Sequence, residues 1–156
     1  MQVETRLGTQ GDVPALVELY RRFRESLVSE RGGARYLAKE AFAEPLDAHF
    51  EAIVADNQRL VLLGTLDDVP VGTAVARLEE LSDSSHLAIV EVLYVDPPAR
   101  EVGVGEKLLE AVVDWAGQGD ATGLDVSVLP GAREAKNFLE GAGFVARLLV
   151  MHRRLS

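Results

Sequence analysis

One stretch decides the fold: Val95-Asp96-Pro97-Pro98-Ala99-Arg100-Glu101-Val102-Gly103-Val104-Gly105. Before it, the apolar run Leu87–Val95 has the length and character of a β-strand. After it, apolar residues recur at helical spacing from Val104 to Trp115, and Gly117-Gln118-Gly119 closes the pattern. The stretch therefore predicts a strand that passes through a glycine-rich turn into a helix.

The two glycines of this turn indicate an anion site. Glycine permits positive φ and lets a phosphate approach the backbone, while the first N–H groups and the dipole of the helix favour negative charge. A pyrophosphate is the natural ligand, and Arg100 and Lys107 can add contacts to it. A turn that only lets a helix begin is the alternative. A nucleotide-binding P-loop is disfavoured because Gly103-Val104-Gly105-Glu106-Lys107 lacks its spacing.

The flanking patterns extend this unit into an α/β layered domain. The expected strands are Gln2–Leu7, Arg59–Leu66, Val69–Leu78, Leu87–Val95, Leu124–Val128 and an extended segment from Gly143 to Leu155. The expected helices are Val13–Val28, Pro45–Asp56, one from about Val104 to Gly117, and Ala132–Ala142. Between the first two helices, Ser29–Glu40 reads as a mobile connection or a broken helix. Residues 1–156 are expected to form one domain around a mixed sheet.

Composition excludes several classes of function. The 156 residues include no cysteine, which removes disulfides, thiolate metal sites and a covalent acyl-cysteine intermediate. A net charge of -9 argues against sequence-independent nucleic-acid binding and mildly favours cationic substrates, although it can also serve solubility alone. No apolar segment is long enough to span a membrane and no signal peptide is evident, so a cytoplasmic protein is expected.

The decisive stretch resembles the acetyl-CoA signature of the GCN5-related N-acetyltransferase (GNAT) family. Val95-Asp96-Pro97 matches the end of the family's fourth strand, and Arg100-x-x-Gly103-x-Gly105 matches its glycine loop. Phe138-Leu139-Glu140-Gly141-Ala142-Gly143-Phe144 then matches the family's downstream Phe-Tyr-Glu-x-x-Gly-Phe. The resemblance implies a mixed, mostly antiparallel sheet of six to seven strands with about four helices, in which strands four and five splay apart.

The resemblance also implies a cofactor and the residues that hold it. The co-substrate would be acetyl-CoA, with no metal, and the backbone of the fourth strand would pair with its pantetheine arm. The amide of Leu93 would polarise the thioester carbonyl. The implied cofactor residues are Leu93, Tyr94, Val95, Arg100, Glu101, Val102, Gly103, Val104, Gly105, Glu106, Lys107 and Asn137.

Three departures from the family pattern bear on this assignment. Glu101-Val102 stands where many members carry glycine and a basic residue, so Glu101 is expected to point to solvent. Ala132 replaces an asparagine that often opens the next helix, and Asn137 cannot replace it directly. Leu139 occupies the position of the tyrosine that often protonates the departing thiolate. A thiol pKa near 8.5 lets the thiolate leave without a strong acid.

The catalytic candidates are Glu91, Leu93 and Tyr94. Strict alternation places Glu91 on the same face as Leu87, Ile89, Leu93 and Val95, where burial would suit a carboxylate for deprotonating an ammonium. Pairing with an arginine or a solvated sheet edge is the equal alternative. Tyr94 can be an ordinary packed aromatic, and the three histidines lack metal-ligand spacing.

The acceptor is expected to enter over the first two helices, as the resemblance implies. This makes Arg31, Arg35 and Tyr36 substrate-binding candidates. The expected reaction is direct acetyl transfer to a primary amine of a small molecule or a peptide, without nucleic-acid or membrane partners, by a monomer or homodimer. A catalytically weak acyl-CoA-binding regulatory module is the alternative.

Overall fold

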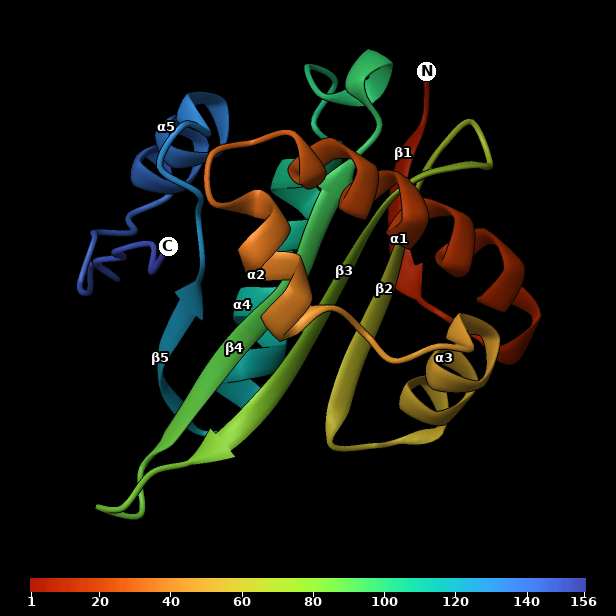
Figure 1. Ribbon diagram of the computed structural model, residues 1–156. Coiled ribbons are helices and arrows are strands. Elements are labelled where there is room, and N and C mark those ends of the chain that lie inside the picture. The colour runs from red at the N-terminus through yellow and green to blue at the C-terminus, as the bar shows by residue number, and fades with distance from the viewer.

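The computed structural model describes residues 1–156 and is built on a five-stranded sheet (Figure 1). Strands β1 (Val3–Leu7), β2 (Arg59–Leu66), β3 (Val69–Glu80), β4 (His86–Val95) and β5 (Ala121–Val126) are neighbours in chain order. The first four are antiparallel, and β5 runs parallel to β4 because a helix returns the chain between them.

Helices cover both faces of this sheet. Helices α1 (Val13–Val28), α2 (Gly33–Glu40) and α3 (Leu46–Ala55) lie on one face, and α4 (Val104–Gln118) lies on the other (Figure 1). Helix α5 (Arg133–Gly141) follows β5. Successive side chains of each strand therefore pack into two hydrophobic cores, one on each face of the sheet. One contains Val61, Val75 and Val92 under α1 and α3, and the other contains Leu62 and Ala74 under α4 along with other apolar residues.

Turn-forming residues mark several of the boundaries between helices and strands. Asp67 and Asp68 both have positive φ, 49° and 66°, as a two-residue hairpin requires. Of the two interpretations of Ser29–Glu40, the broken helix is confirmed, because α2 begins anew at Gly33 after a turn at Gly32 with φ of 79°. This helix makes the total five, where about four were predicted. None of the helices combines the length and apolarity needed to cross a membrane.

The number of strands was overestimated. The predicted strand over residues 143–155 does not form: no backbone hydrogen bond holds residues 145–156, and Arg147 contacts β5 only through its side chain, at Asp125. Val145, Leu148, Leu149, Val150, Met151 and Leu155 remain 68–88% exposed. A β-prone segment becomes a strand only where a neighbour completes its ladder, and here none does.

Strands β4 and β5 diverge as expected. Their paired register runs from His86↔Ala121 to Val90↔Val126, where β5 ends. Strand β4 continues through Glu91–Val95 without a neighbour on that side. The half of β4 that leads into the glycine turn is therefore an open sheet edge, which can accept an extended ligand.

Candidate functional site

The glycine turn forms an open cap on α4. A short 3₁₀ turn (Pro97–Ala99) follows β4, and Gly103 begins α4 with φ of 94°. Only glycine adopts this conformation without strain. A Cβ placed on Gly103 would meet no atom within 4 Å, so the space in front of the turn is empty of protein.

The backbone of this turn presents a row of unused donors. None of the consecutive N–H groups from Glu101 to Glu106 donates a hydrogen bond within the protein. The first intrahelical donor is Lys107, whose N–H reaches the carbonyl of Gly103 at 3.1 Å. Helix termini leave such groups unsatisfied, and their partial positive charge suits an anion. The turn can therefore hold a phosphate group through main-chain contacts.

The charged side chains around the turn take different positions. Arg100 folds back: its Nε donates to the Val95 carbonyl at 2.8 Å, and its guanidinium lies 5.9 Å from the centre of the Tyr94 ring. Glu101 and Lys107 are exposed and form no ion pair, so Glu101 faces solvent as expected. The turn therefore offers an anion mainly backbone N–H groups and no cluster of basic side chains.

The open half of β4 directs backbone groups toward the gap beside β5. The N–H of Asp96 donates to the carbonyl of Val71 at 2.7 Å, and bonded pairs alternate along an antiparallel ladder. The Tyr94–Thr73 pair is then bonded to β3, while Leu93 and Val95 turn their N–H and C=O groups away from β3. The Leu93 amide thus points into the gap, as the sequence interpretation requires.

Glu91 does not lie where strict alternation put it. The register shifts from Val75↔Val92 to Ala76↔Val90, so Glu91 is the extra residue of a β-bulge. Val90 and Leu93 belong to the α4 core, whereas Glu91 shares the α1–α3 face with Val92. The prediction that Glu91 lies on one face with Leu93 and Val95 is wrong, because the bulge reverses the alternation between them.

On the α1–α3 face, Glu91 is paired. Its carboxylate contacts the Arg59 guanidinium of β2, and its second oxygen lies 3.8 Å from Nε of Arg77 on β3. Burial raises the pKa of Glu91, while the two arginines oppose this rise. Both arginines escaped the sequence analysis, because they are 32 and 14 residues away from Glu91 and only the sheet register brings the three together.

Tyr94 is buried among aromatic neighbours. Its ring meets Phe23 of α1 edge-on at 6.3 Å. Burial, with the nearby Asp96 carboxylate, raises the pKa of Tyr94. Tyr94 also lines a hollow of about 350 Å³ beside the 3₁₀ turn, where Arg22 binds Asp96 at 2.8 Å. The Tyr94 ring packs toward α1, whereas the N–H of the neighbouring Leu93 points into the gap beside β5.

Of the predicted acceptor residues, Arg31 lies in the turn between α1 and α2, and Arg35 and Tyr36 lie in α2. Arg31 and Arg35 are exposed and make no ion pair, and Tyr36 is half-buried. Burial raises the pKa of Tyr36, and the charges of Glu40 and Glu91 add to this rise. Helix α2, which carries Tyr36, lies on the same side of the sheet as α1 and α3, the side to which Glu91 is turned (Figure 1).

Helix α5 reaches the glycine turn through Phe138. A Cβ on Gly105 would lie 3.6 Å from the Phe138 ring and 3.7 Å from Val95. Asn137, predicted to bind the cofactor, is exposed, and Leu139 is buried. The structure thus brings Phe138, rather than Asn137, against the turn.

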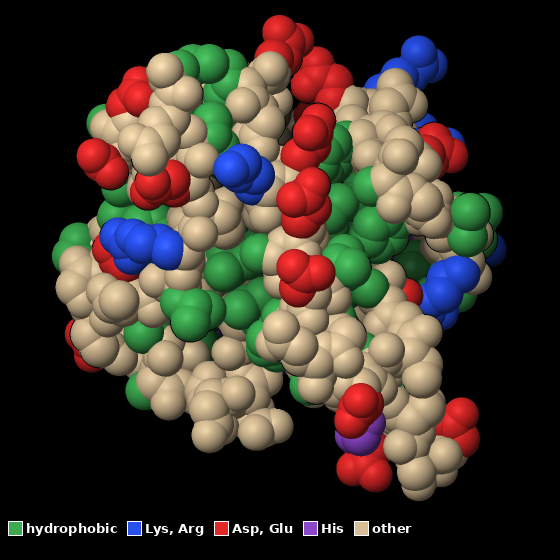
Figure 2. All heavy atoms as spheres, turned by 180° about the vertical axis from the view of Figure 1, so that it is seen from behind, with side chains coloured by type: hydrophobic (Ala, Val, Ile, Leu, Met, Phe, Trp, Pro, Cys, Tyr) green, Lys and Arg blue, Asp and Glu red, His purple; other side chains and the backbone are tan.

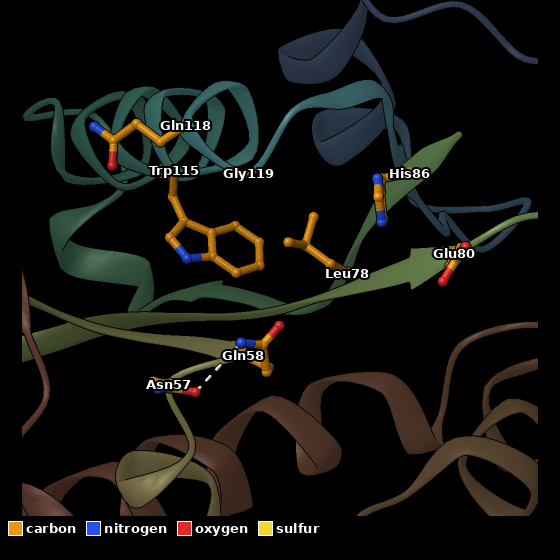
Figure 3. Close-up of a pocket in the computed structure, with 8 residues that line it drawn as sticks. All are labelled: Asn57, Gln58, Leu78, Glu80, His86, Trp115, Gln118 and Gly119. Carbon is orange, nitrogen blue, oxygen red and sulfur yellow. Dashed lines mark hydrogen bonds between the residues drawn. The ribbon is translucent and has the colours of Figure 1, made fainter. Parts of the chain in front are cut away.

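A second hollow lies at the opposite end of the sheet. It measures about 510 Å³ and is lined by Asn57, Gln58, Leu78, Glu80, His86, Trp115, Gln118 and Gly119 (Figure 3). These residues come from the turn before β2, the end of β3, the start of β4, and the end of α4 with the residue that follows it, and Trp115 and Leu78 face each other. No residue of the glycine turn contributes to it.

The surface of α4 is acidic. Glu106, Glu110 and Asp114 are exposed and spaced four residues apart, which places them on one stripe of the helix. In the view from behind, acidic side chains form a column down the middle of the molecule (Figure 2). Such a face repels a polyanion and does not suit nucleic acid. The structure also contains no group of three or more His, Cys, Asp or Glu side chains placed to hold a metal ion.

Comparisons with known proteins agree with this architecture. The sequence profile of the acetyltransferase (GNAT) family matches residues 13–144. An uncharacterised N-acetyltransferase of Bacillus subtilis, YhfO, is 26% identical over 140 residues, which span 89% of this chain and 87% of that protein.

Solved structures share the fold at low identity. An aminoglycoside acetyltransferase from an uncultured soil metagenomic sample has a TM-score of 0.74 and 19% identity, covering 99% of this chain and 95% of the other. Glucosamine-6-phosphate N-acetyltransferase from Arabidopsis thaliana has a TM-score of 0.72 and 17% identity, with both chains covered completely at 100%. The family match spans most of the sequence, and the chain belongs to the acetyltransferase (GNAT) family.

Proposed function

We propose that this protein transfers an acetyl group from acetyl-CoA to a primary amine by direct attack in a ternary complex. The observation that carries the proposal is the row of free N–H groups from Glu101 to Glu106, next to the open edge of β4. The row suits the CoA pyrophosphate, and the edge suits the amide-bearing pantetheine arm. Both lie on one continuous path from α4 to Leu93.

In this proposal, the chain supplies two chemical functions. The Leu93 amide, directed into the gap, stabilises the charge that develops on the thioester oxygen, worth about 2.7–4 kcal/mol where the geometry is favourable. Glu91 accepts a proton from the acceptor's ammonium group, directly or through water. The freed nitrogen lone pair bonds to the carbonyl carbon, the C–S bond breaks, and CoA leaves as the thiolate, while the second proton of the nitrogen passes to the thiolate or to water.

Acceptor recognition is assigned to the turn between α1 and α2 and to α2 itself. Arg31 lies just before α2, and Arg35 and Tyr36 lie in α2, which is on the face of the sheet to which Glu91 is turned. The solved relatives act on aminoglycosides and on glucosamine-6-phosphate, so amino sugars belong in the first set of acceptors to be tested. A cytoplasmic location and a monomeric or homodimeric state stay predictions.

A second candidate function is acyl-CoA binding without efficient turnover. It is favoured by Leu139, which is buried where many family members carry a tyrosine acid. One experiment separates the two: CoA release measured over a panel of amino sugars, polyamines, peptides and aminoglycosides, alongside calorimetric binding of acetyl-CoA. Amine-dependent CoA release supports the enzyme. Tight binding without release for any amine supports the binding module, and absence of binding rejects both.

A further inference from the structure

The ion pair between β2 and β4 sits at the proposed reaction centre. Arg59 and Glu91 have side chains that are only 19% and 24% exposed, so their contact is largely shielded from water. Most other arginine–carboxylate pairs of the protein involve side chains that are more open to solvent, as in Arg6–Asp12 with an arginine exposed by 50%. Shielded pairs interact more strongly than exposed ones.

The bulge at Glu91 gives this pair its geometry. Because Glu91 is the extra residue between Val90 and Val92, its carboxylate is turned to the α1–α3 face. Arg59 pairs with Arg77 in the β2–β3 register, so both guanidinium groups rise on that face beside it. Arg77 is more exposed, at 38%, and more distant, at 3.8 Å. Arg59 is therefore the closer of the two contacts.

Charged and titratable groups face Glu91 from every surrounding element. Arg59 of β2 and Arg77 of β3 contact Glu91, and Tyr36 and Glu40 of α2 and Tyr20 of α1 are close enough to interact with its charge. Behind the arginines, His49 of α3 lies near Arg59, and Glu79 of β3 pairs with Arg77. Glu40 and burial disfavour a charged carboxylate at position 91, and only the two arginines favour it. A base must be ionised before it can accept a proton.

We infer that Arg59 is a positioning residue, which holds the Glu91 carboxylate ionised and aimed at the acceptor side of β4. This inference rests on the proposed function, in which Glu91 is the base. The Arg59 guanidinium makes its one side-chain hydrogen bond with Glu91, while its Nε is buried and has no partner. The polar contact of Arg59 is therefore directed to the proposed base.

The test compares Arg59→Gln with the wild type in two measurements. The first is the ionisation of the Glu91 carboxyl, followed by carbon-13 NMR across pH. The second is the acid limb of the pH profile of kcat/KM with the best amine. Removing the arginine charge is expected to move both upward by about one pH unit or more, because an adjacent cation lowers a carboxyl pKa by that order. The kcat/KM of Arg59→Gln should fall less at high pH, where Glu91 is ionised even without the arginine, than on the acid limb.

Three further variants make the result interpretable. Arg77→Gln should move both curves less, because Arg77 is farther away and more exposed. Arg59→Lys keeps the positive charge, so both of its curves should stay close to those of the wild type. This variant also provides a test if Arg59→Gln folds poorly. Arg6→Gln breaks a pair on β1 far from the site and should leave both curves unchanged. Acetyl-CoA binding should be retained in all of them.

The outcomes separate this inference from the proposed function. If neither curve moves in Arg59→Gln while Glu91→Gln abolishes turnover, the role of Arg59 is overturned and the proposed base survives. If the carboxyl titration moves but the rate profile does not, Arg59 acts on a carboxylate that is not the base, and the inference is overturned. Coincident shifts of both curves support it.

Discussion

Gly103 offers the sharpest test of the glycine turn, because its backbone conformation disfavours a side chain while the space around it would admit one. Its φ of 94° disfavours any side chain, yet a Cβ there would contact nothing within 4 Å. Gly103→Ala should therefore cost strain alone, about 1–2 kcal/mol. For a domain of this size, that lowers Tm by roughly 2–8 °C.

The same strain acts on the backbone that carries the free N–H groups. Binding of acetyl-CoA should weaken by about tenfold or more, since a loss of about 1.4 kcal/mol is tenfold in affinity. Gly105→Ala is the matched control. Its Cβ would make ordinary contacts with Phe138 and Val95 at 3.6 and 3.7 Å, and its φ is not positive. Its stability should be unchanged or higher by up to about 1 kcal/mol.

The two variants are compared by thermal unfolding and by calorimetric titration with acetyl-CoA. The reasoning fails if Gly105→Ala loses as much stability as Gly103→Ala. It also fails if Gly103→Ala binds acetyl-CoA as tightly as the wild type.

Three further predictions concern the framework around the site. Gly33→Ala should destabilise the protein by about 1–3 kcal/mol in chemical denaturation, because its Cβ would lie 1.7 Å from the Leu27 carbonyl; Gly117→Ala in α4, where nothing lies within 4 Å, should not. Tyr20→Phe should cost about 1–3 kcal/mol, since the Phe42 N–H loses its 2.8 Å acceptor, and an unchanged unfolding midpoint would contradict this. Arg6 lowers the pKa of Asp12, so this pair stabilises the fold above the ordinary aspartate pKa and ceases to do so as the pH falls through the depressed one. Unfolding measured from pH 7 downward should therefore show a weaker pH dependence in Asp12→Asn, and an identical slope would count against the pair.

The sequence predicted features that are encoded locally. The turn at Gly103, the start of α4 at Val104 and the Asp67-Asp68 hairpin depend on residues within a few positions of one another. The open edge of β4 was expected from a resemblance, and the register that ends at Val90 accounts for it physically.

Features that depend on the pairing of strands across the sheet could not be predicted from the local sequence. The bulge that turns Glu91 to the other face depends on the β3–β4 register, and its arginine partners come from two other strands. The segment after Gly143 shows the same limit, because its apolar residues predict a strand but cannot specify a partner.

The central claim is that the backbone from Glu101 to Glu106, with the open edge of β4, holds acetyl-CoA. Nitrogen-15 NMR of the amides during titration with acetyl-CoA tests it most directly. We predict saturable shifts concentrated in residues 101–106 and at Leu93 and Val95, with little change around Trp115. Saturable shifts centred on the Trp115 hollow, or binding that leaves the 101–106 amides unmoved, would contradict the account.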